Sequence, residues 1–323
     1  MPASVIHEPV ISWYAESARS LPWREPGADG WHVLVSEFML QQTPVSRVLG
    51  VYASWVARWP TPSALASDPA GQAVRMWGGL GYPRRALRLH AAAVVIDELH
   101  HGEVPKTYDE LRALPGVGDY TAAAVAAFAF QQRTVVLDTN VRRVLGRVLT
   151  GVALPPVGIV ADERRLAEQV LPDDAPTAAT WSVAAMELGA VVCTARAPRC
   201  GVCPVSGLCA WRRLGYPTDS SRTARSQSYV GTDRQCRGRL LALLRSSDVP
   251  LPWQLVDAAW SDGPQRQRAL GSLLDDGLVV ESGEDALALA GEAALDKRWI
   301  SSEAEPPRQA ERRAARPSRS RRT

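Results

Sequence analysis

The chain has 323 residues, of which 46% are hydrophobic and 22% charged. This composition is that of a globular protein with at least one substantial core, and it predicts two or three folding units. No segment approaches eighteen uninterrupted apolar residues and the N-terminal residues do not resemble a signal peptide, so we expect an unprocessed cytoplasmic protein without membrane contact.

The net charge of +3 is unevenly distributed along the chain. Residues 306–323 contain seven arginines and one glutamate, so the first 305 residues sum to about −3. Such a tail is typical of a disordered, solvated end, and a nucleic-acid-binding arm is the alternative. The only lysines in the chain are Lys106 and Lys297, which leaves few candidates for an amine nucleophile.

Apolar residues recur at three- and four-residue spacing, with breaks at Gly and Pro, and this pattern predicts a mainly α-helical fold. Helices are expected at 9–18, 31–42, 45–58, 62–67, 70–77, 83–100, 107–113, 119–130, 139–149, 162–170 and 177–191.

The C-terminal third differs from the rest of the chain. Residues 220–232 are polar and without apolar periodicity, which is typical of a linker. Residues 233–290 show three short helical patterns followed by two apolar strands, "GLVVES" and "ALALA". This order predicts a winged-helix-like unit that binds either DNA or a protein surface. Residues 291–323 form the basic tail, which we expect to be disordered.

Residues 114–125, "LPGVGDYTAAAV", place a glycine turn directly before a helix. A helix N-terminus exposes unpaired N–H groups and the positive end of the helix dipole, so the backbone of Gly116, Val117 and Gly118 is suited to bind a phosphate. The alternative is an ordinary helix start with Asp119 near the cap. If the ligand is DNA, such a contact positions the duplex without reading its sequence.

Glu37 lies in "HVLVSEFMLQQTP", where apolar residues occupy nearly all sides of the expected helix. A buried carboxyl group should have a raised pKa, which suits a general acid near neutral pH. The alternative is a structural glutamate that is paired with a buried arginine. Gln41 lies one helical turn further along the same face.

In "TVVLDTNVRRVLGRVL", an apolar run leads to Asp138 in the first turn of the next helix. Aspartate is a preferred N-cap, so ordinary capping explains this residue. An aspartate that backbone N–H groups keep ionised would also stabilise positive charge developing on a sugar. One residue can serve both purposes.

Four of the five cysteines lie within seventeen residues, with the spacing C-x6-C-x2-C-x5-C, whereas Cys236 stands alone. In a chain without a secretory signal this clustering indicates a metal or iron–sulfur site, not disulfides. The number of thiolates is compatible with zinc and with an iron–sulfur cluster alike.

Several segments together resemble the MutY-type adenine DNA glycosylases of the helix-hairpin-helix, endonuclease III-like superfamily. They occur in the order of that family and extend over residues 10–215. The segments are "LPWR" at 21–24, "VSEFMLQQTPV" at 35–45, "GLGYPRRA" at 79–86, "LPGVGDYTA" at 114–122, "LDTNVRR" at 137–143, "MELGAVVCT" at 186–194 and the four cysteines.

This resemblance implies a two-lobed, mainly α DNA glycosylase with a small C-terminal winged-helix-like unit. One lobe would combine residues 1–24 with residues 134–219, and the other, residues 25–133, would be a six-helix module containing the hairpin. In this superfamily the observed cysteine spacing holds a [4Fe–4S] cluster with a structural or DNA-sensing role. Its implied ligands are Cys193, Cys200, Cys203 and Cys209.

The resemblance also implies a monofunctional base excision repair enzyme, which hydrolyses the N-glycosidic bond of adenine opposite 8-oxoguanine or guanine after extruding the base. Glu37 would protonate adenine at N7 and manage the attacking water, while Asp138 would stabilise an oxocarbenium-like sugar. Asn140 and Tyr120 would support Asp138. The implied contacts to DNA and to the extruded base are Gln42 and Tyr82 near the lesion, and Trp23, Arg24, Leu40 and Met186 in the pocket. We expect a monomer that acts on double-stranded DNA in the cytoplasm, at the nucleoid.

Three alternatives remain beside this interpretation. An endonuclease III-like enzyme would need a lysine in place of Tyr120 for strand cleavage, and neither lysine lies there. Thymine or uracil mismatch glycosylases share the hairpin and the cluster but generally lack a counterpart of Glu37. The third alternative belongs to another class: a non-catalytic, iron–sulfur-containing DNA-binding regulator.

The sequence departs from the family after residue 230. This region contains no histidine and does not resemble the Nudix-like domain with which many relatives inspect 8-oxoguanine. A preference for 8-oxoguanine over guanine is therefore left open, or must come from the helical body. "LDTN" replaces the "LDGN" of many members and Val183 replaces a polar pocket residue, changes that we expect to alter the rate and not the reaction.

Overall fold

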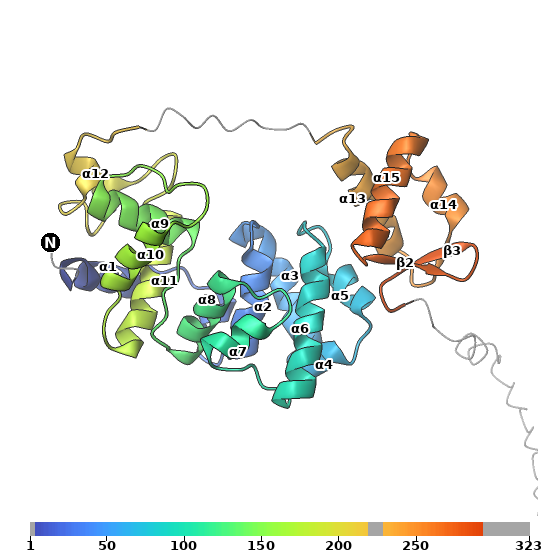
Figure 1. Cartoon of the computed structure of the whole chain (residues 1–323), viewed down its shortest axis with the longest axis horizontal. Helices are drawn as coiled ribbons and strands as arrows, with labels where there is room; N and C mark the ends of the chain where they lie inside the picture. Colours follow the sequence, from blue (N-terminus) through green and yellow to red (C-terminus); the bar gives the residue numbers. More distant parts are fainter. Residues whose placement is uncertain (1–3, 219–228, 293–323) are drawn as a thin grey trace, which may run out of the picture.

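The computed structural model describes residues 4–218 and 229–292, and this part of the chain is mainly helical (Figure 1). The N-terminal elements are α1 (Ser4–Ser17), η1 (Pro22–Arg24), α2 (Gly30–Leu40), α3 (Val45–Arg58), α4 (Pro62–Ala66), α5 (Ala70–Trp77) and α6 (Arg84–His100). The hairpin helices are α7 (Tyr108–Ala113) and α8 (Asp119–Phe130). They are followed by α9 (Thr139–Leu145), η2 (Gly146–Thr150), α10 (Ala161–Gln169), α11 (Ala175–Val191), η3 (Cys200–Val202) and α12 (Ala210–Arg213).

The last described elements are α13 (Asp233–Arg245), β1 (Leu251–Pro252), α14 (Trp253–Ala258), α15 (Gly263–Asp275), β2 (Val279–Ser282) and β3 (Ala286–Leu289). The strands form an antiparallel sheet in the order β1-β3-β2, in which Val279 pairs with Leu289 and Leu251 with Leu287. Periodicity predicted α14, α15, β2 and β3 but not the two-residue strand β1.

The helix bounds agree with the expected ones to within a few residues, except at two places. The first is α1, which begins five residues before the expected start and contains Pro9. Ile6 and Val10 are both almost fully buried, so packing holds a helix that proline would otherwise interrupt. The second is the helix expected to end at residue 149, which changes after Leu145 into the π-helical segment η2.

The first hydrophobic core fills the part of the molecule that contains α2 to α8. Trp55 lies at its centre, with its ring centroid 4.7 Å from that of Trp59 and 5.6 Å from that of Trp77. Buried side chains of α13, α15, β2 and β3, among them Leu240 and Leu287, belong to the same contiguous core.

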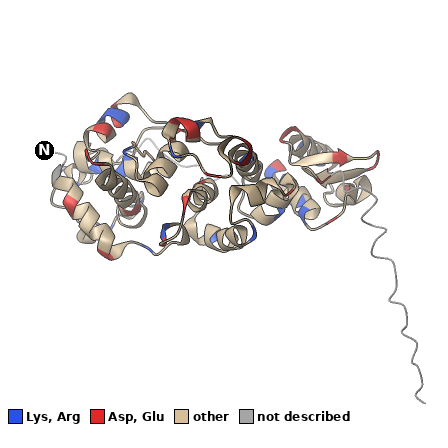
Figure 2. Cartoon of the chain, turned by 90° about the horizontal axis from the view of Figure 1, so that it is seen from below, with Lys and Arg blue, Asp and Glu red and all other residues tan. Residues whose placement is uncertain are grey.

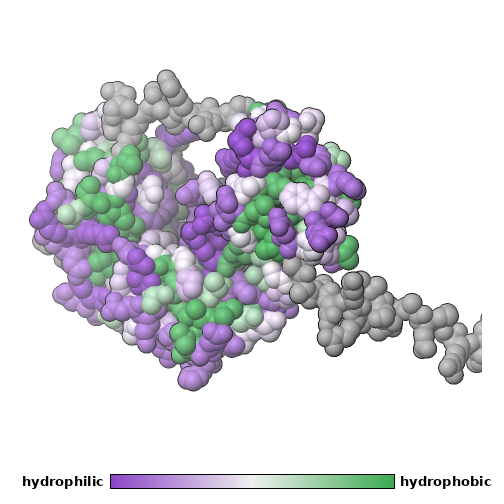
Figure 3. Space-filling model, turned by 45° about the vertical axis from the view of Figure 1, so that its right-hand side comes forward, coloured by the Kyte–Doolittle hydropathy of each residue, from purple (hydrophilic) through white to green (hydrophobic). Residues whose placement is uncertain are grey.

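The second core joins segments that are far apart in sequence. Ile6 and Val10 of α1 pack with buried side chains between Leu137 and Val205, from α9, α11 and the cysteine loop. Figure 1 shows these elements as one lobe beside α2 and α8. The surface is deeply hollowed between this lobe and the C-terminal elements (Figure 3).

Two expectations lie outside the described residues. They are most of the linker, at 219–228, and the basic tail from residue 293 onward. Within the described ranges, no helix has the length and apolar character needed to cross a membrane.

Candidate active site

A cavity of about 460 Å³ lies between the two lobes. Its walls come from η1, α2, α8, α9 and α11, so neither lobe could form it alone. It brings together eight of the residues that the sequence singled out: Trp23, Arg24, Glu37, Leu40, Tyr120, Asp138, Asn140 and Met186. Val183 also lines it.

Glu37 is presented to the cavity by α2. Asp29 caps this helix by accepting hydrogen bonds from the backbone N–H groups of Trp31 and His32. Glu37 is only 4% exposed, and burial raises its pKa to about 7, although a hydrogen bond from Tyr120 opposes the rise. At neutral pH this carboxyl group is therefore divided between its protonated and ionised forms.

Tyr120 stands in the first turn of α8, opposite Glu37. Its hydroxyl oxygen also lies 3.6 Å from Sδ of Met186. Burial and the two nearby carboxylates, Glu37 and Asp138, raise the pKa of Tyr120 well above its ordinary value. The phenol is thus a neutral hydrogen-bond donor and cannot act as a nucleophile near neutral pH.

Asp138 is the N-cap of α9, and its Oδ1 accepts a 2.7 Å hydrogen bond from the backbone N–H of Val141. Its Oδ2 accepts a 2.6 Å bond from Nδ2 of Asn140. Burial outweighs these bonds and raises the pKa of Asp138 above its ordinary value. Asp138 nevertheless both caps α9 and lines the cavity.

Asn140 is held from both sides. Its Oδ1 accepts a 2.8 Å hydrogen bond from Nη2 of Arg143, which also donates to the carbonyl oxygen of Gly189 at 2.7 Å. Gly189 lies so close that a Cβ there would be 2.7 Å from the backbone oxygen of Asn140. The orientation of the Asn140 amide is therefore set by α11 as well as by its own helix.

Glu187 is a cavity residue that sequence reasoning missed. Its carboxylate is fully buried and binds Arg19 in a bidentate pair at 2.5 and 2.8 Å, and Nη1 of Arg24 at 3.1 Å. Although burial acts in the opposite direction, these partners lower the pKa of Glu187. For Glu37, the alternative was a structural glutamate paired with an arginine, and Glu187 is such a residue. Glu37 itself has no ion-pair partner among the described residues.

Gln42 and Tyr82 are not part of the cavity wall. Both have left-handed backbone, with φ of 56° and 48°, and both are exposed, Tyr82 to 51%. Few non-glycine residues adopt this conformation, and such strain is common at functional sites. The guanidinium of Arg85 connects their loops, because it donates to the carbonyl oxygens of Gln41 and Gly81.

The glycine turn has the geometry that an anion site requires. Gly116 has φ of +77°. The N-cap of α8 is Gly118, which has no side chain to cap the helix. Asp119 is the first residue of α8, directly after the cap, and its side chain pairs with Arg112 and Arg164. The N–H groups at the start of α8 are left for a ligand or water.

The four clustered cysteines line one small, largely apolar cavity between α9, α11 and the loop that follows α11. They are half-buried and free of disulfides. Nη1 of Arg147 lies 3.4 Å from Sγ of Cys193, which suits a thiolate. Four convergent thiols in an apolar, positively flanked loop fit an iron–sulfur cluster.

Family comparisons agree with this arrangement. Residues 35–155 match the family described as HhH-GPD superfamily base excision DNA repair protein, and residues 193–209 match the iron–sulfur binding domain of endonuclease III. The fold and the site thus define a helix-hairpin-helix base excision repair protein with an iron–sulfur cluster.

Comparison with individual proteins identifies the family more closely. The chain is 52% identical over 284 residues to adenine DNA glycosylase of Mycobacterium tuberculosis (strain CDC 1551 / Oshkosh), covering 88% of this chain and 93% of the relative. The same identity and length hold for adenine DNA glycosylase of Mycolicibacterium smegmatis, with 88% and 95% covered. The chain therefore belongs to the adenine DNA glycosylase family. A solved thermostable thymine-DNA glycosylase has a similar fold, with a TM-score of 0.59 and 25% identity over 66% of this chain and 97% of that one.

Proposed function

We propose that the protein is a monofunctional adenine DNA glycosylase that hydrolyses the N-glycosidic bond of adenine opposite 8-oxoguanine or guanine. The observation that carries this proposal is the single cavity shared by Glu37, with its pKa raised to about 7, and Asp138. The relatives at 52% identity bear the name of this activity.

In the proposed mechanism the two carboxyl groups have different roles. Glu37, which is protonated in an appreciable fraction of molecules near neutral pH, donates its proton to N7 of the departing adenine. Asp138 in its ionised form stabilises the positive charge that develops on the sugar. Asn140 orients Asp138 through their 2.6 Å hydrogen bond, and Tyr120 holds Glu37.

The proposed pocket receives the extruded adenine between apolar and charged walls. Trp23, Leu40 and Met186 supply apolar surface, and Arg24 is fixed by the buried Glu187. Among the described residues, no lysine lines this wall. Tyr120 occupies the position at which an endonuclease III-like enzyme would need its lysine nucleophile. Base removal without strand cleavage is the consequence, since no lysine lines the cavity in the described part of the chain to form a Schiff base.

DNA contact is proposed along the face that carries the hairpin. The N–H groups of Gly116 and Gly118 bind a backbone phosphate, which positions the duplex, while the N–H of Val117 donates to the carbonyl oxygen of Leu114 within the turn. Gln42 and Tyr82, both exposed and in left-handed conformation, insert beside the extruded base. We propose further that the chain acts as a monomer, at the nucleoid, with units at 1–24 plus 134–219, 25–133 and 233–290.

The cluster is proposed to be of the [4Fe–4S] type, held by the four clustered cysteines. Bound there, it cross-links the loop between α11 and α12 and supplies no hydrolytic chemistry. Arg143 and Arg147 lie against this loop, since they donate to the backbone carbonyls of Cys193 and Thr194.

The experiment is adenine release from duplexes that place adenine opposite 8-oxoguanine, guanine or cytosine, at one stated salt concentration. Release opposite 8-oxoguanine or guanine, with strands broken only after alkali, supports the proposal. Strand cleavage without alkali would favour an endonuclease III-like enzyme. If brown protein binds the duplex but creates no alkali-labile site, the protein is a DNA-binding regulator.

A further inference from the structure

The C-terminal unit, residues 233–292, lies outside both matched family segments. It contains six arginines and ten acidic residues, a net charge of −4. Figure 2 marks acidic residues of this unit in red on the ribbon. This net charge supplies no overall electrostatic attraction to DNA phosphates.

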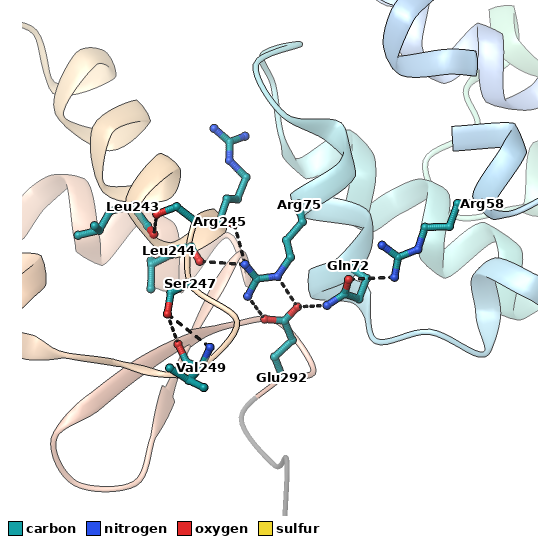
Figure 4. A network of polar contacts seen from close by, with 10 residues as sticks. Arg58, Gln72, Arg75, Leu243, Leu244, Arg245, Ser247, Val249 and Glu292 are labelled. Atoms are coloured by element: carbon teal, nitrogen blue, oxygen red, sulfur yellow. Dashed lines mark hydrogen bonds and ion pairs between the residues drawn. The ribbon is translucent and has the colours of Figure 1, made fainter. Parts of the chain in front are cut away.

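The unit is anchored to α5 through Glu292 (Figure 4). Arg75 binds the Glu292 carboxylate in a bidentate pair, Nε to Oε1 at 2.9 Å and Nη2 to Oε2 at 2.5 Å. Gln72 donates to the same Oε1 at 2.9 Å. The side chains of Arg75 and Glu292 are only 13% and 8% exposed, so solvent screens this pair much less than a surface pair.

Arg75 also binds the end of α13. Its Nη1 donates to the carbonyl oxygens of Leu244 and Arg245, in the last turn of the helix, at 3.2 and 2.7 Å. Gly71 adds a backbone hydrogen bond to Ala290 at 2.6 Å. One arginine of the helical body therefore fixes both the last helical turn of α13 and the end of the sheet.

From this fixed position, α13 reaches the loop 78–82 that carries Tyr82. Arg245 donates a hydrogen bond to the carbonyl oxygen of Gly78. Arg47 binds the next carbonyl, that of Gly79, and Arg85 binds that of Gly81 at 2.9 Å. Three arginines from separate segments thus hold successive parts of this one loop.

The C-terminal unit also contacts Tyr82 itself. The guanidinium carbon of Arg234, in the first turn of α13, lies 6.0 Å from the centroid of the Tyr82 ring, and that of Arg85 lies at 5.5 Å. Tyr82 has a left-handed φ of 48°, which a free loop would abandon for a more favourable conformation. External contacts are what keep it there.

We propose that the C-terminal unit is a positioning element for the loop 78–82, with Arg245 as its positioning residue and the Arg75–Glu292 pair as its anchor. The unit then acts through Tyr82 on the recognition of the mispaired site, without contacting the extruded base. The inference rests on the proposed function only in that Tyr82 is the residue proposed to insert into the duplex.

The test compares Arg245→Ala and Arg245→Lys with Arg268→Ala as the matched control. Arg268 lies in the same unit and pairs with Asp233 on the surface, and among the described residues it has no hydrogen bond or ion pair to the loop. Hydrogen exchange of the peptide that spans residues 77–85 reports the loop directly. Duplex affinity with and without a mispaired adenine, and single-turnover adenine release at saturating enzyme, report its effect.

Arg245→Ala is expected to accelerate exchange in residues 78–82 at least tenfold and to reduce the affinity ratio between mispaired and paired duplex at least fivefold. The rate at saturating enzyme should fall less than the affinity ratio. Arg245→Lys should restore part of both losses, and Arg268→Ala should match the wild type. Folded Arg245→Ala with wild-type exchange and affinity ratio would overturn the inference.

Two further variants test the inference independently if Arg245→Ala does not fold. Glu292→Gln weakens the Arg75–Glu292 pair. Gly71→Ala should displace Glu292, because a Cβ at Gly71 would lie 2.7 Å from the Glu292 carboxyl carbon. Both should accelerate exchange in the same peptide, and unchanged exchange in both contradicts the inference. If the wild type releases no adenine, the proposed function fails, while the exchange results still decide whether the unit holds the loop.

Discussion

Arg143 donates a 2.6 Å hydrogen bond from Nε to the backbone carbonyl oxygen of Cys193. With Nη2, the same guanidinium binds Oδ1 of Asn140 at 2.8 Å, and Asn140 in turn binds Asp138. The cysteine loop and the acid that is proposed to stabilise the sugar are therefore separated by two side chains. A disturbance of the loop is transmitted to the cavity by direct contact.

Removal of a cluster ligand should impair catalysis from a distance. Cys200→Ser is expected to lower the iron content and the visible absorbance, and to reduce adenine release at least tenfold although Cys200 does not line the cavity. Iron analysis and single-turnover assays measure the two effects. Cys236→Ser is the control, because Cys236 lies in the C-terminal unit and should affect neither. Full activity in protein that has lost its iron would contradict this coupling.

Glu37→Gln should abolish adenine release, since the amide cannot donate the proton. In the wild type the protonated fraction of Glu37 decreases as the pH rises through about 7, so the rate of the chemical step should decline above that pH. Single-turnover rates between pH 5 and 9 measure the decline. A rate that stays constant to pH 9 would remove Glu37 from the role of acid.

The same substitution should stabilise the fold at alkaline pH. The pKa of Glu37 is raised in the folded protein, so its contribution to the free energy of unfolding falls as the pH rises from about 4.5 to about 7. Burying the ionised form costs on the order of 3 kcal/mol at pH 8, which Glu37→Gln avoids. Thermal unfolding should show a higher Tm for Glu37→Gln at pH 8 and little difference at pH 4.

Asp138→Asn separates capping from catalysis. Asparagine also caps helices well, so the free energy of unfolding should change by less than about 1 kcal/mol. Adenine release should fall at least a hundredfold, because the neutral amide cannot stabilise a cationic sugar. Asp174→Asn is the matched control: Asp174 caps α11 through the N–H of Thr177 and is outside the cavity wall. Equal loss of activity in the two variants would mean that only the cap matters.

Gly189→Ala should displace Asn140. The added Cβ would lie 2.7 Å from both the Cβ and the backbone oxygen of Asn140, which cannot move away without disturbing the start of α9. We expect a loss of about 10²-fold in the rate of adenine release, typical of a shift of about 1 Å in a catalytic group. Gly271→Ala, in α15, is the control, since nothing lies within 4 Å of its added Cβ. Wild-type rates in both would show that Asn140 tolerates displacement.

Local patterns predicted much of the fold and the site. Helices 45–58, 70–77 and 119–130 lie where the apolar periodicity and the Gly and Pro breaks placed them. The apolar surroundings of Glu37 in sequence correctly indicated its burial and its raised pKa. These features are local, because each depends on residues within one or two helical turns.

What sequence reasoning missed depends on contacts between distant segments. Glu187 carries no local sign of its function, since its partners Arg19 and Arg24 are more than 160 residues away. The balance of burial and hydrogen bonding at Asp138 is likewise set by tertiary packing. The early start of α1 follows from the burial of Ile6 and Val10 in the second core, which overrides the preference of Pro9.

The path of the chain through the second core also affects how the protein folds during synthesis. α1 is synthesised before its partners, since Ile6 and Val10 pack with residues between 137 and 205. At a synthesis rate of about 5–20 residues per second, the apolar side chains of α1 are without these partners for roughly ten seconds or more. The helices of residues 30–130 can already fold during this time. The second core, and with it the cavity between the lobes, can therefore close only after the cysteine loop has been made.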